Sequence, residues 1–238
     1  MAIRSGASPW TAHATDLIRC PRAFASGGQT PSLADTKVNL AKVLKEEMEY
    51  ESDYQSPETL SGSVPGGFSV QMKDRDMQVT LVKEKDGELI EVSAIAARAE
   101  HEPLEDDLED PDDEDIVQDM AMPFVVSVEP KGGGGSRRLC FECKAFSGEL
   151  EVINVRFEDD RWLPKDAEEA AAVADMEPYE GPYFSELDET LQKALYDYLD
   201  ARGINVEFSS YIFQLLSDKE QKEYARWLGD VHDFVSSK

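Results

Sequence analysis

The fold is decided by one stretch, residues 179–238, which contains the letters YEGPYFSELDETLQKALYDYLDARGINVEFSSYIFQLLSDKEQKEYARWLGDVHDFVSSK. Apolar side chains recur in it at steps of three and four residues, a spacing that predicts amphipathic helices. We predict one helix over 186–202, because Ser185 and Asp188 form a capping-box pattern and Gly203 is a natural stop. Its apolar stripe comprises Leu187, Leu191, Ala194, Leu195 and Tyr198.

A second helix is predicted over 218–235, where Ser217 and Glu220 repeat the capping-box pattern. Its apolar stripe comprises Tyr224, Trp227, Leu228, Val231, Phe234 and Val235. Between the two helices, the short segment 208–216 is almost wholly apolar on one side. Stripes of this width are unfavourable in water, so each must be buried against a sheet or another subunit.

The charge of the chain is unusual. Among its 238 residues, 50 are acidic and 24 are basic, which gives a formal net charge of −26. A field of this sign repels nucleic acid and anionic lipid and attracts basic proteins and cations. Direct binding of nucleic acid is therefore disfavoured, although a basic partner could bridge the protein to RNA. The 3 cysteines make no disulfide framework, and no apolar run reaches the roughly 18 residues of a membrane span.

The first 33 residues differ from the rest of the chain. They contain three arginines and a single acid, Asp16, among Ser, Thr and Ala, and the composition turns acidic after Leu33. Arginine-rich and acid-poor composition is typical of an organellar transit peptide, and a tail without function is the alternative. We predict an organellar transit peptide over 1–33, which the resemblance described below makes mitochondrial, and a single domain over 34–238.

A helix followed by short strands is predicted over the next part of the chain. The helix covers 36–51, with Asp35 or Thr36 as its cap. Apolar and polar residues then alternate over the segments 68–72, 77–81, 88–96, 124–129, 138–146 and 149–158. Asp86-Gly87 is a hairpin signal between two of these segments. About six short strands joined by tight turns predict an antiparallel meander, and with the helices an α+β fold.

The stretch 100–121 does not fit the sheet pattern. Its acids include Glu105, Asp106, Asp107, Glu109, Asp110, Asp112, Asp113, Glu114 and Asp115. Like charges at this density repel one another and there is little apolar surface to bury, so we predict a mobile loop that binds a basic partner. The run lacks the spacing of an EF-hand, and diffuse cation binding is the most that it supports.

The motif Cys140-Phe141-Glu142-Cys143 is the first candidate for chemistry, as a redox dithiol or half of a zinc site. It lies in a predicted strand, where an offset of three residues places two side chains on opposite faces. No second cysteine or histidine pair completes a tetrahedral site. The glycine run 132–135 lacks the Lys-Ser/Thr ending of a P-loop. We therefore predict no catalytic, metal or cofactor-binding residue.

The C-terminal stretch resembles the signature of the mitochondrial acidic matrix proteins, the mitochondrial glycoprotein family, whose animal member is also known as the receptor for the globular heads of a complement component. The resemblance begins with YEGPYF at 179–184. It continues through Leu187, Asp188, Leu191, Gln192, Tyr198, Leu199, Arg202, Gly203, Ile204, Glu223, Tyr224, Trp227, Leu228, Phe234 and Val235. It is specific at the C-terminus and only general in the strands, and the glycine run is a local departure.

This resemblance implies about seven consecutive antiparallel strands, flanked by one N-terminal and two C-terminal helices, in a doughnut-shaped homotrimer. It also implies a non-enzymatic, chaperone-like protein of the mitochondrial matrix that captures basic ribosomal or RNA-binding proteins. Such a protein supports mitochondrial translation, RNA processing and oxidative phosphorylation, with indirect contact to RNA and no cofactor. Two alternatives stay open, a diffuse calcium-binding protein and an enzyme whose site spans the trimer channel. The expected core and oligomer contacts are Leu187, Leu191, Leu195, Tyr198, Tyr224, Trp227, Leu228, Val231 and Phe234.

Overall fold

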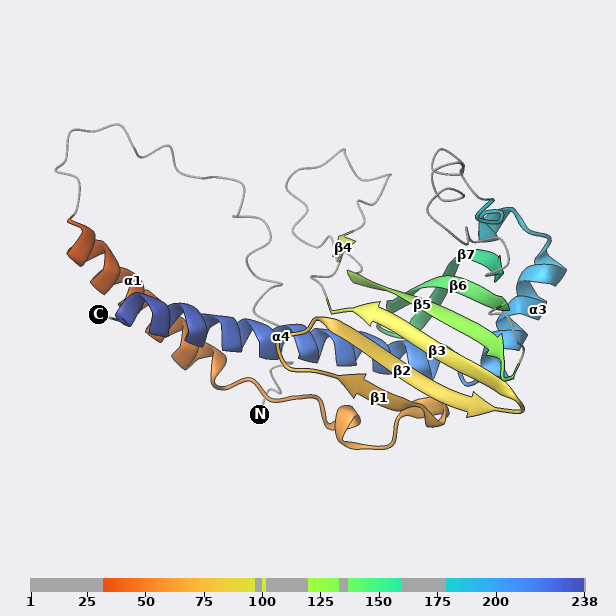
Figure 1. Ribbon diagram of the computed structural model, residues 1–238, viewed down its shortest axis with the longest axis horizontal. Helices are drawn as coiled ribbons and strands as arrows, with labels where there is room; N and C mark the ends of the chain where they lie inside the picture. The colour runs from red at the N-terminus through yellow and green to blue at the C-terminus, as the bar shows by residue number, and fades with distance from the viewer. Residues whose placement is uncertain (1–31, 97–99, 102–119, 133–136, 160–178, 238) are drawn as a thin grey trace, which may run out of the picture.

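The computed structural model describes residues 32–96, 100–101, 120–132, 137–159 and 179–237. Its sheet is antiparallel throughout, and six strands follow one another in the order β1-β2-β3-β5-β6-β7 (Figure 1). Their bounds are β1 Ser69–Met72, β2 Gln78–Lys85, β3 Glu88–Ile95, β5 Met120–Pro130, β6 Arg137–Phe146 and β7 Glu149–Asp159. The predicted six-stranded meander is therefore confirmed. A two-residue strand, β4 (Glu100–His101), pairs with the start of β5, so β4 and β5 occupy both ends of the stretch that we predicted as a loop.

The predicted hairpin between β2 and β3 is also confirmed. Asp86 and Gly87 have φ values of 50° and 82°. Positive φ at both central residues is what a two-residue turn needs to match the right-handed twist of the paired strands. Short turns of this kind place consecutive strands side by side, which explains why the sheet order follows the chain.

The C-terminal helix is longer than predicted. α4 is a single 31-residue helix, Val206–Ser236, so the division into a segment 208–216 and a helix after Ser217 is wrong. Asn205 caps the helix, because its side-chain oxygen accepts the N–H of Phe208 at 3.1 Å. Inside the helix, the Ser217 hydroxyl donates at 2.9 Å to the carbonyl of Phe213. A mid-helix serine can bond in this way one turn back, so its spacing from an acid does not mark a helix start.

α3 (Glu189–Asp200) begins three residues later than predicted. Its cap is Asp188, whose carboxylate accepts the N–H of Thr190 at 2.9 Å. The predicted stop is confirmed: Gly203 has a φ of 84°. A Cβ at this position would lie 2.7 Å from the Cα of Gly66, so both the backbone conformation and the close approach require glycine.

α1 (Leu33–Glu51) begins three residues earlier than predicted. Ser32 is its cap and accepts the N–H of Asp35 at 3.2 Å. The side chains of α1 that pack on α4 are those of Ala41, Leu44 and Met48, which are half-buried or buried. No helix in the described part of the chain is long and apolar enough to cross a membrane.

The core lies between the sheet and the first half of α4. Phe208, Ile212 and Leu216 are fully buried and lie on one face of the helix. The Phe208 ring lies 5.0 Å from the ring of Phe68 and 6.4 Å from that of Phe124. The sheet contributes the fully buried side chains Val79, Leu81, Ile90, Val92, Val126 and Phe141.

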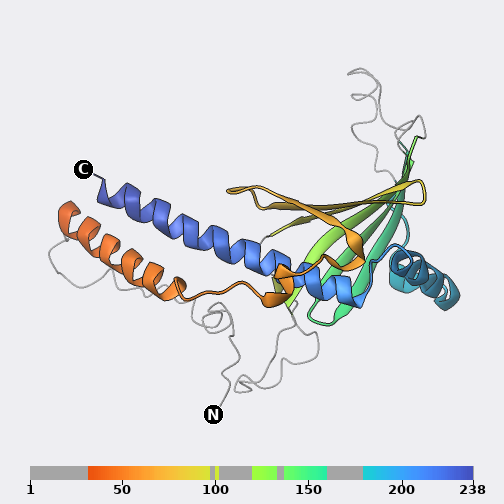
Figure 2. The ribbon, with the colours of Figure 1, turned by 90° about the horizontal axis from the view of Figure 1, so that it is seen from below.

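The second half of α4 extends beyond the sheet. Figures 1 and 2 show α1 running antiparallel beside it, while α3 lies near the opposite end of the sheet. We call α1 together with residues 219–236 of α4 the arm. The molecule therefore has a packed body, formed by the sheet and the start of α4, and an arm of two helices.

We expect Phe208→Ala to lower the free energy of unfolding by about 3–5 kcal/mol, because it leaves a large cavity between α4 and the sheet. Chemical denaturation followed by circular dichroism measures this. The matched control is Val206→Ala in the first turn of the same helix, whose side chain is exposed and whose removal should change stability by less than about 0.5 kcal/mol. Equal effects of the two substitutions would contradict the assignment of the core.

Candidate functional site

The residues singled out by the sequence are nine loop acids, predicted to bind partners, and nine helix residues, predicted to form the core and the oligomer contacts. All nine acids of the predicted loop lie within 102–119, outside the described residues. The nine helix residues are described and separate into two sets. Leu228 is buried, and Leu187, Leu195, Tyr198, Tyr224 and Val231 are half-buried. Leu191, Trp227 and Phe234 are exposed, with 47%, 55% and 79% of their surface accessible.

On α3, the stripe is used mainly within the subunit. Leu187, Leu195 and Tyr198 pack against the hydrophobic core. The Tyr198 ring lies 6.0 Å from the ring of Phe141, and the guanidinium of Arg202 lies 3.3 Å from the centre of the same tyrosine ring. These contacts dock α3 on the sheet, so α3 is part of the body.

α1 carries a second apolar stripe beside the one that packs on α4. Leu40, Val43 and Tyr50 are exposed on the described surface. At 100° per residue, they lie roughly 100° around the helix from the stripe of Ala41 and Leu44. By their spacing alone, Leu40 and Val43 only widen the stripe of Ala41 and Leu44, and the spacing does not show which part of it α4 covers.

The outer half of α4 repeats this arrangement. Trp227, Val231 and Phe234 lie roughly 100° around the helix from the buried Leu228. The Trp227 ring stacks on Tyr224 with centroids 6.0 Å apart. In an antiparallel helix pair, offsets of the same sign on both helices point to the same side. The two exposed stripes therefore form one apolar surface along the arm.

We call this surface the open face; it consists of Leu40, Val43, Tyr50, Trp227, Val231 and Phe234. Its two helices are linked by the hydroxyl of Tyr224, which donates at 3.2 Å to the carboxylate of Glu47. Apolar residues gathered on one surface, unlike those scattered singly, mark an interaction site. The open face is thus the candidate site that the described residues support.

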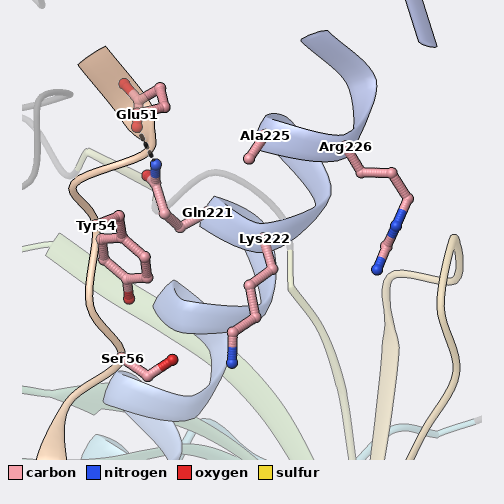
Figure 3. A pocket seen from close by; sticks show the side chains of 7 residues that line it. All are labelled: Glu51, Tyr54, Ser56, Gln221, Lys222, Ala225 and Arg226. Atoms are coloured by element: carbon pink, nitrogen blue, oxygen red, sulfur yellow. Dashed lines mark hydrogen bonds between the residues drawn. The ribbon is translucent and has the colours of Figure 1, made fainter. Parts of the chain in front are cut away.

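A polar contact fixes the place where α1 ends against α4. Figure 3 shows Glu51 and Gln221 pointing toward each other beside a cavity of about 370 Å³, which is also lined by Tyr54, Ser56, Lys222, Ala225 and Arg226. Glu51 is 6% exposed, and its carboxylate accepts a hydrogen bond from the Gln221 amide. Burial raises the pKa of Glu51, the Gln221 hydrogen bond lowers it, and the nearby Glu47 charge raises it.

Two further polar contacts lie beside this cavity. The Tyr54 hydroxyl donates at 3.1 Å to the buried carboxylate of Asp218, and Lys222 donates to the same carboxylate at 2.7 Å. Burial, together with the charge of Asp218, raises the pKa of Tyr54 to about 12. The tyrosine therefore stays protonated and keeps its hydrogen bond, which holds the segment after α1 against α4.

The two cysteines of the C-x-x-C motif face opposite sides of the sheet, as predicted. Cys143 belongs to the core with Phe141, whereas Cys140 pairs in register with Arg156 and lies near Glu158. Burial and the charge of Glu158 raise the pKa of Cys140 to about 11, and burial also raises the pKa of Cys143. Both thiols are therefore protonated at neutral pH. Within the described residues, no group of three or more His, Cys, Asp or Glu could hold a metal ion.

The antiparallel sheet, backed by one long helix that projects beyond it, defines an α+β protein. The model of the mitochondrial glycoprotein family matches residues 42–235, and the chain belongs to this family. The mitochondrial acidic protein mam33 of Schizosaccharomyces pombe is 27% identical over 94% of this chain and 88% of its own length. An uncharacterized mitochondrial protein of Arabidopsis thaliana is 27% identical over 72% of this chain. The matched part spans 64% of the length of that relative.

Solved structures share the fold. A hypothetical protein from Leishmania major, described as a sequence homologue of human p32, has a TM-score of 0.63 at 24% identity and covers 84% of this chain and 99% of its own. The p22 protein of Trypanosoma brucei has a TM-score of 0.62 at 24% identity, and the match covers 85% of this chain and 100% of the p22 chain. None of these four proteins is named as an enzyme. The word acidic in the name of the Schizosaccharomyces pombe relative agrees with the net charge of −26 of this chain.

We expect Glu51→Gln to raise the free energy of unfolding at pH 7 by about 0.5–2 kcal/mol, as repair of one unfavourable group commonly does. The folded-state pKa of Glu51 lies above its ordinary value of 4.5. Stability from this group is therefore complete below that value and is lost as the pH rises through the folded-state pKa. Melting curves from about pH 4 to pH 8 measure the effect.

The control for this substitution is Glu46→Gln, which removes a largely exposed carboxylate from the same helix. It should leave the pH profile of the melting temperature unchanged. A Glu51→Gln variant that is less stable than the unchanged protein at pH 7, and equal to it at low pH, would show that the ionised carboxylate stabilises this contact.

Proposed function

We propose that the protein is a non-enzymatic, chaperone-like binding protein of the mitochondrial matrix. It captures basic ribosomal or RNA-binding proteins and thereby supports mitochondrial translation, RNA processing and oxidative phosphorylation. The observation that carries this proposal is the net charge of −26. The name of the acidic mitochondrial relative in Schizosaccharomyces pombe supports it. Contact with RNA is indirect, because phosphates and this chain carry charge of the same sign.

The charge acts over a short range. Fields of this kind raise the rate of capture of oppositely charged partners by roughly 10–10³. At physiological ionic strength, screening limits the field to about 8 Å from the surface. A partner must therefore approach closely, and the acids between Glu105 and Asp115 supply the densest charge in the sequence. We assign the first contact with basic partners to this acidic loop.

Self-association multiplies the charge. The first 33 residues contribute +2, so residues 34–238 carry −28 and three copies of them carry −84. We assign the removable transit peptide to 1–33 and the trimer to the single domain 34–238. The open face of the arm supports self-association, because five of its six apolar side chains are exposed in the subunit and Val231 is half-buried, and a second copy offers surfaces of the same composition.

Binding to a basic ribosomal protein should weaken by about tenfold or more between about 50 mM and 200 mM salt, because ionic screening opposes charge-driven capture. Isothermal calorimetry measures it. Replacement of the nine loop acids by Asn or Gln should weaken binding to a similar degree at low salt. The control permutes the loop sequence and keeps its charges, and it should bind normally. Affinity that ignores salt would contradict the proposal.

Trp227→Ala should convert the trimer to monomers with little change in the unfolding of each chain. Trp227 is 55% exposed in the subunit, so its ring is available to a neighbouring copy, and aromatic anchors at interfaces commonly contribute about 2 kcal/mol or more. Analytical ultracentrifugation reports the stoichiometry. Tyr179→Ala, which removes an exposed aromatic ring away from the arm, is the control and should remain trimeric. A monomeric unchanged protein would refute the proposed assembly.

A further inference from the structure

The turn between β1 and β2 reaches beyond the sheet to the middle of α4. In Figure 2, this turn projects over the helix where the arm begins. The backbone N–H of Arg75 donates to both carboxylate oxygens of Glu223, at 3.1 and 3.2 Å. The Arg75 guanidinium binds the carboxylate of Asp230 through both terminal nitrogens, one of them at 3.1 Å. One turn residue thus contacts α4 at two positions, seven residues apart.

Two further contacts come from the same turn. The ammonium of Lys219 donates at 2.7 Å to the backbone carbonyl of Lys73, and the guanidinium of Arg226 lies 3.2 Å from the carboxylate of Asp74. Residues 73–75 and the α4 residues Lys219, Glu223, Arg226 and Asp230 together form a set of contacts that we call the brace. Its four α4 residues recur at steps of four, three and four, so they form one stripe of the helix.

The brace lies opposite α1. Its stripe is roughly 180° around α4 from Gln221, at 100° per residue, and the Gln221 amide donates to Glu51 at the end of α1. The middle of α4 is therefore held from two sides, by α1 and by the β1–β2 turn. The brace also begins beyond Leu216, the last fully buried core residue of the helix. It thus acts on the arm, where the core does not reach.

The local chemistry of the brace is unusual. Arg75 has a φ of 65°, a left-handed conformation that carries strain in a non-glycine residue and persists when surrounding contacts enforce it. Hydrogen bonds from Arg226, and then from Lys219 and the Arg75 backbone, hold the pKa of Glu223 at about 2 against the opposing effect of burial. The Glu223 carboxylate is therefore ionised at all physiological pH values and keeps the contact in place.

We infer that the brace fixes the angle between the arm and the sheet, and that this angle selects a closed trimer. This inference rests on the proposed homotrimer. A head-to-tail interface closes into a ring only when the rotation between neighbours is correct, and otherwise it gives open chains of mixed size. Because the arm carries the open face, the direction of the arm sets the rotation between neighbouring subunits. Arg75 and Glu223 are positioning residues for the assembly.

The test is a double variant, Arg75→Gly with Glu223→Gln. Glycine accepts the positive φ of position 75 without strain, and the two changes remove the guanidinium contact to Asp230 and the charge of Glu223. Analytical ultracentrifugation of the unchanged protein should show one trimeric species. The double variant should show a mixture of sizes, with the trimer weakened by about tenfold or more, while the unfolding transition of the body is retained.

The control is Glu49→Gln, which removes an exposed arm carboxylate that pairs with Lys45 at 3.7 Å. It changes the charge of the arm by the same amount as Glu223→Gln, and it should remain a single trimer. A double variant that remains a single trimer, whether or not its melting temperature falls, would overturn the inference and leave the brace as a local stabiliser of the turn.

A direct measurement of the angle separates this inference from the proposed trimer. Spin labels are attached at the exposed positions Asp233 on the arm and Glu91 on the sheet, in a Cys20→Ser background and diluted with unlabelled chains. The brace predicts a narrow distance distribution in the unchanged sequence and a broad one in the double variant. If the unchanged protein is monomeric, the proposed assembly fails while this readout still tests the brace. Equal widths would overturn it.

Discussion

The structure depends on the burial of one half of α4 under the sheet. Phe208, Ile212 and Leu216 fix both the position and the roll of the helix, because each is fully enclosed. At 1.5 Å per residue, the 31 residues of α4 span about 46 Å. A continuous helix transmits its roll along its length. The packing near Phe208 therefore decides in which direction Trp227 and Phe234 face, although they lie far from the core.

The arm adds polar contacts to the apolar packing of Leu44 and Leu228. On one side, the Gln221 amide donates to Glu51, whose ionised form burial disfavours. On the other side, Glu223 is stabilised in its ionised form by the cations and the backbone N–H that surround it. The body thus rests on apolar packing, and the arm combines apolar packing with hydrogen bonds, whose geometry is directional.

Several of the basic side chains serve the fold. Lys83 donates at 2.9 Å to the carbonyl of Arg202 and Lys85 donates at 2.6 Å to that of Ala201, where cations are favoured by the exposed carbonyls at the end of α3. Arg202 itself pairs with Glu88 at 2.8 Å. Cations used in this way are bound to groups of their own subunit.

The sequence by itself determined the strand order, the turns, the faces of Cys140 and Cys143, and the amphipathic character of the helices. These properties follow from the alternation of side chains in strands, from the helical period and from the conformational freedom of glycine, all of which are local. The charge is likewise a property of the sequence alone. The resemblance at the C-terminus led to the family. The acidic loop lies outside the described residues, so its role stays a prediction.

Only the tertiary structure decided that α4 is continuous, which apolar stripe of the arm stays open, and that Glu51 is buried. Ser217 reads equally well as a cap or as a mid-helix residue, and the packing of the preceding segment on the sheet selects the second. The brace shows the reason most clearly, since Arg75 meets Glu223 across 148 residues of chain. A contact between distant segments leaves no period or spacing in the sequence, because it depends on how the elements pack.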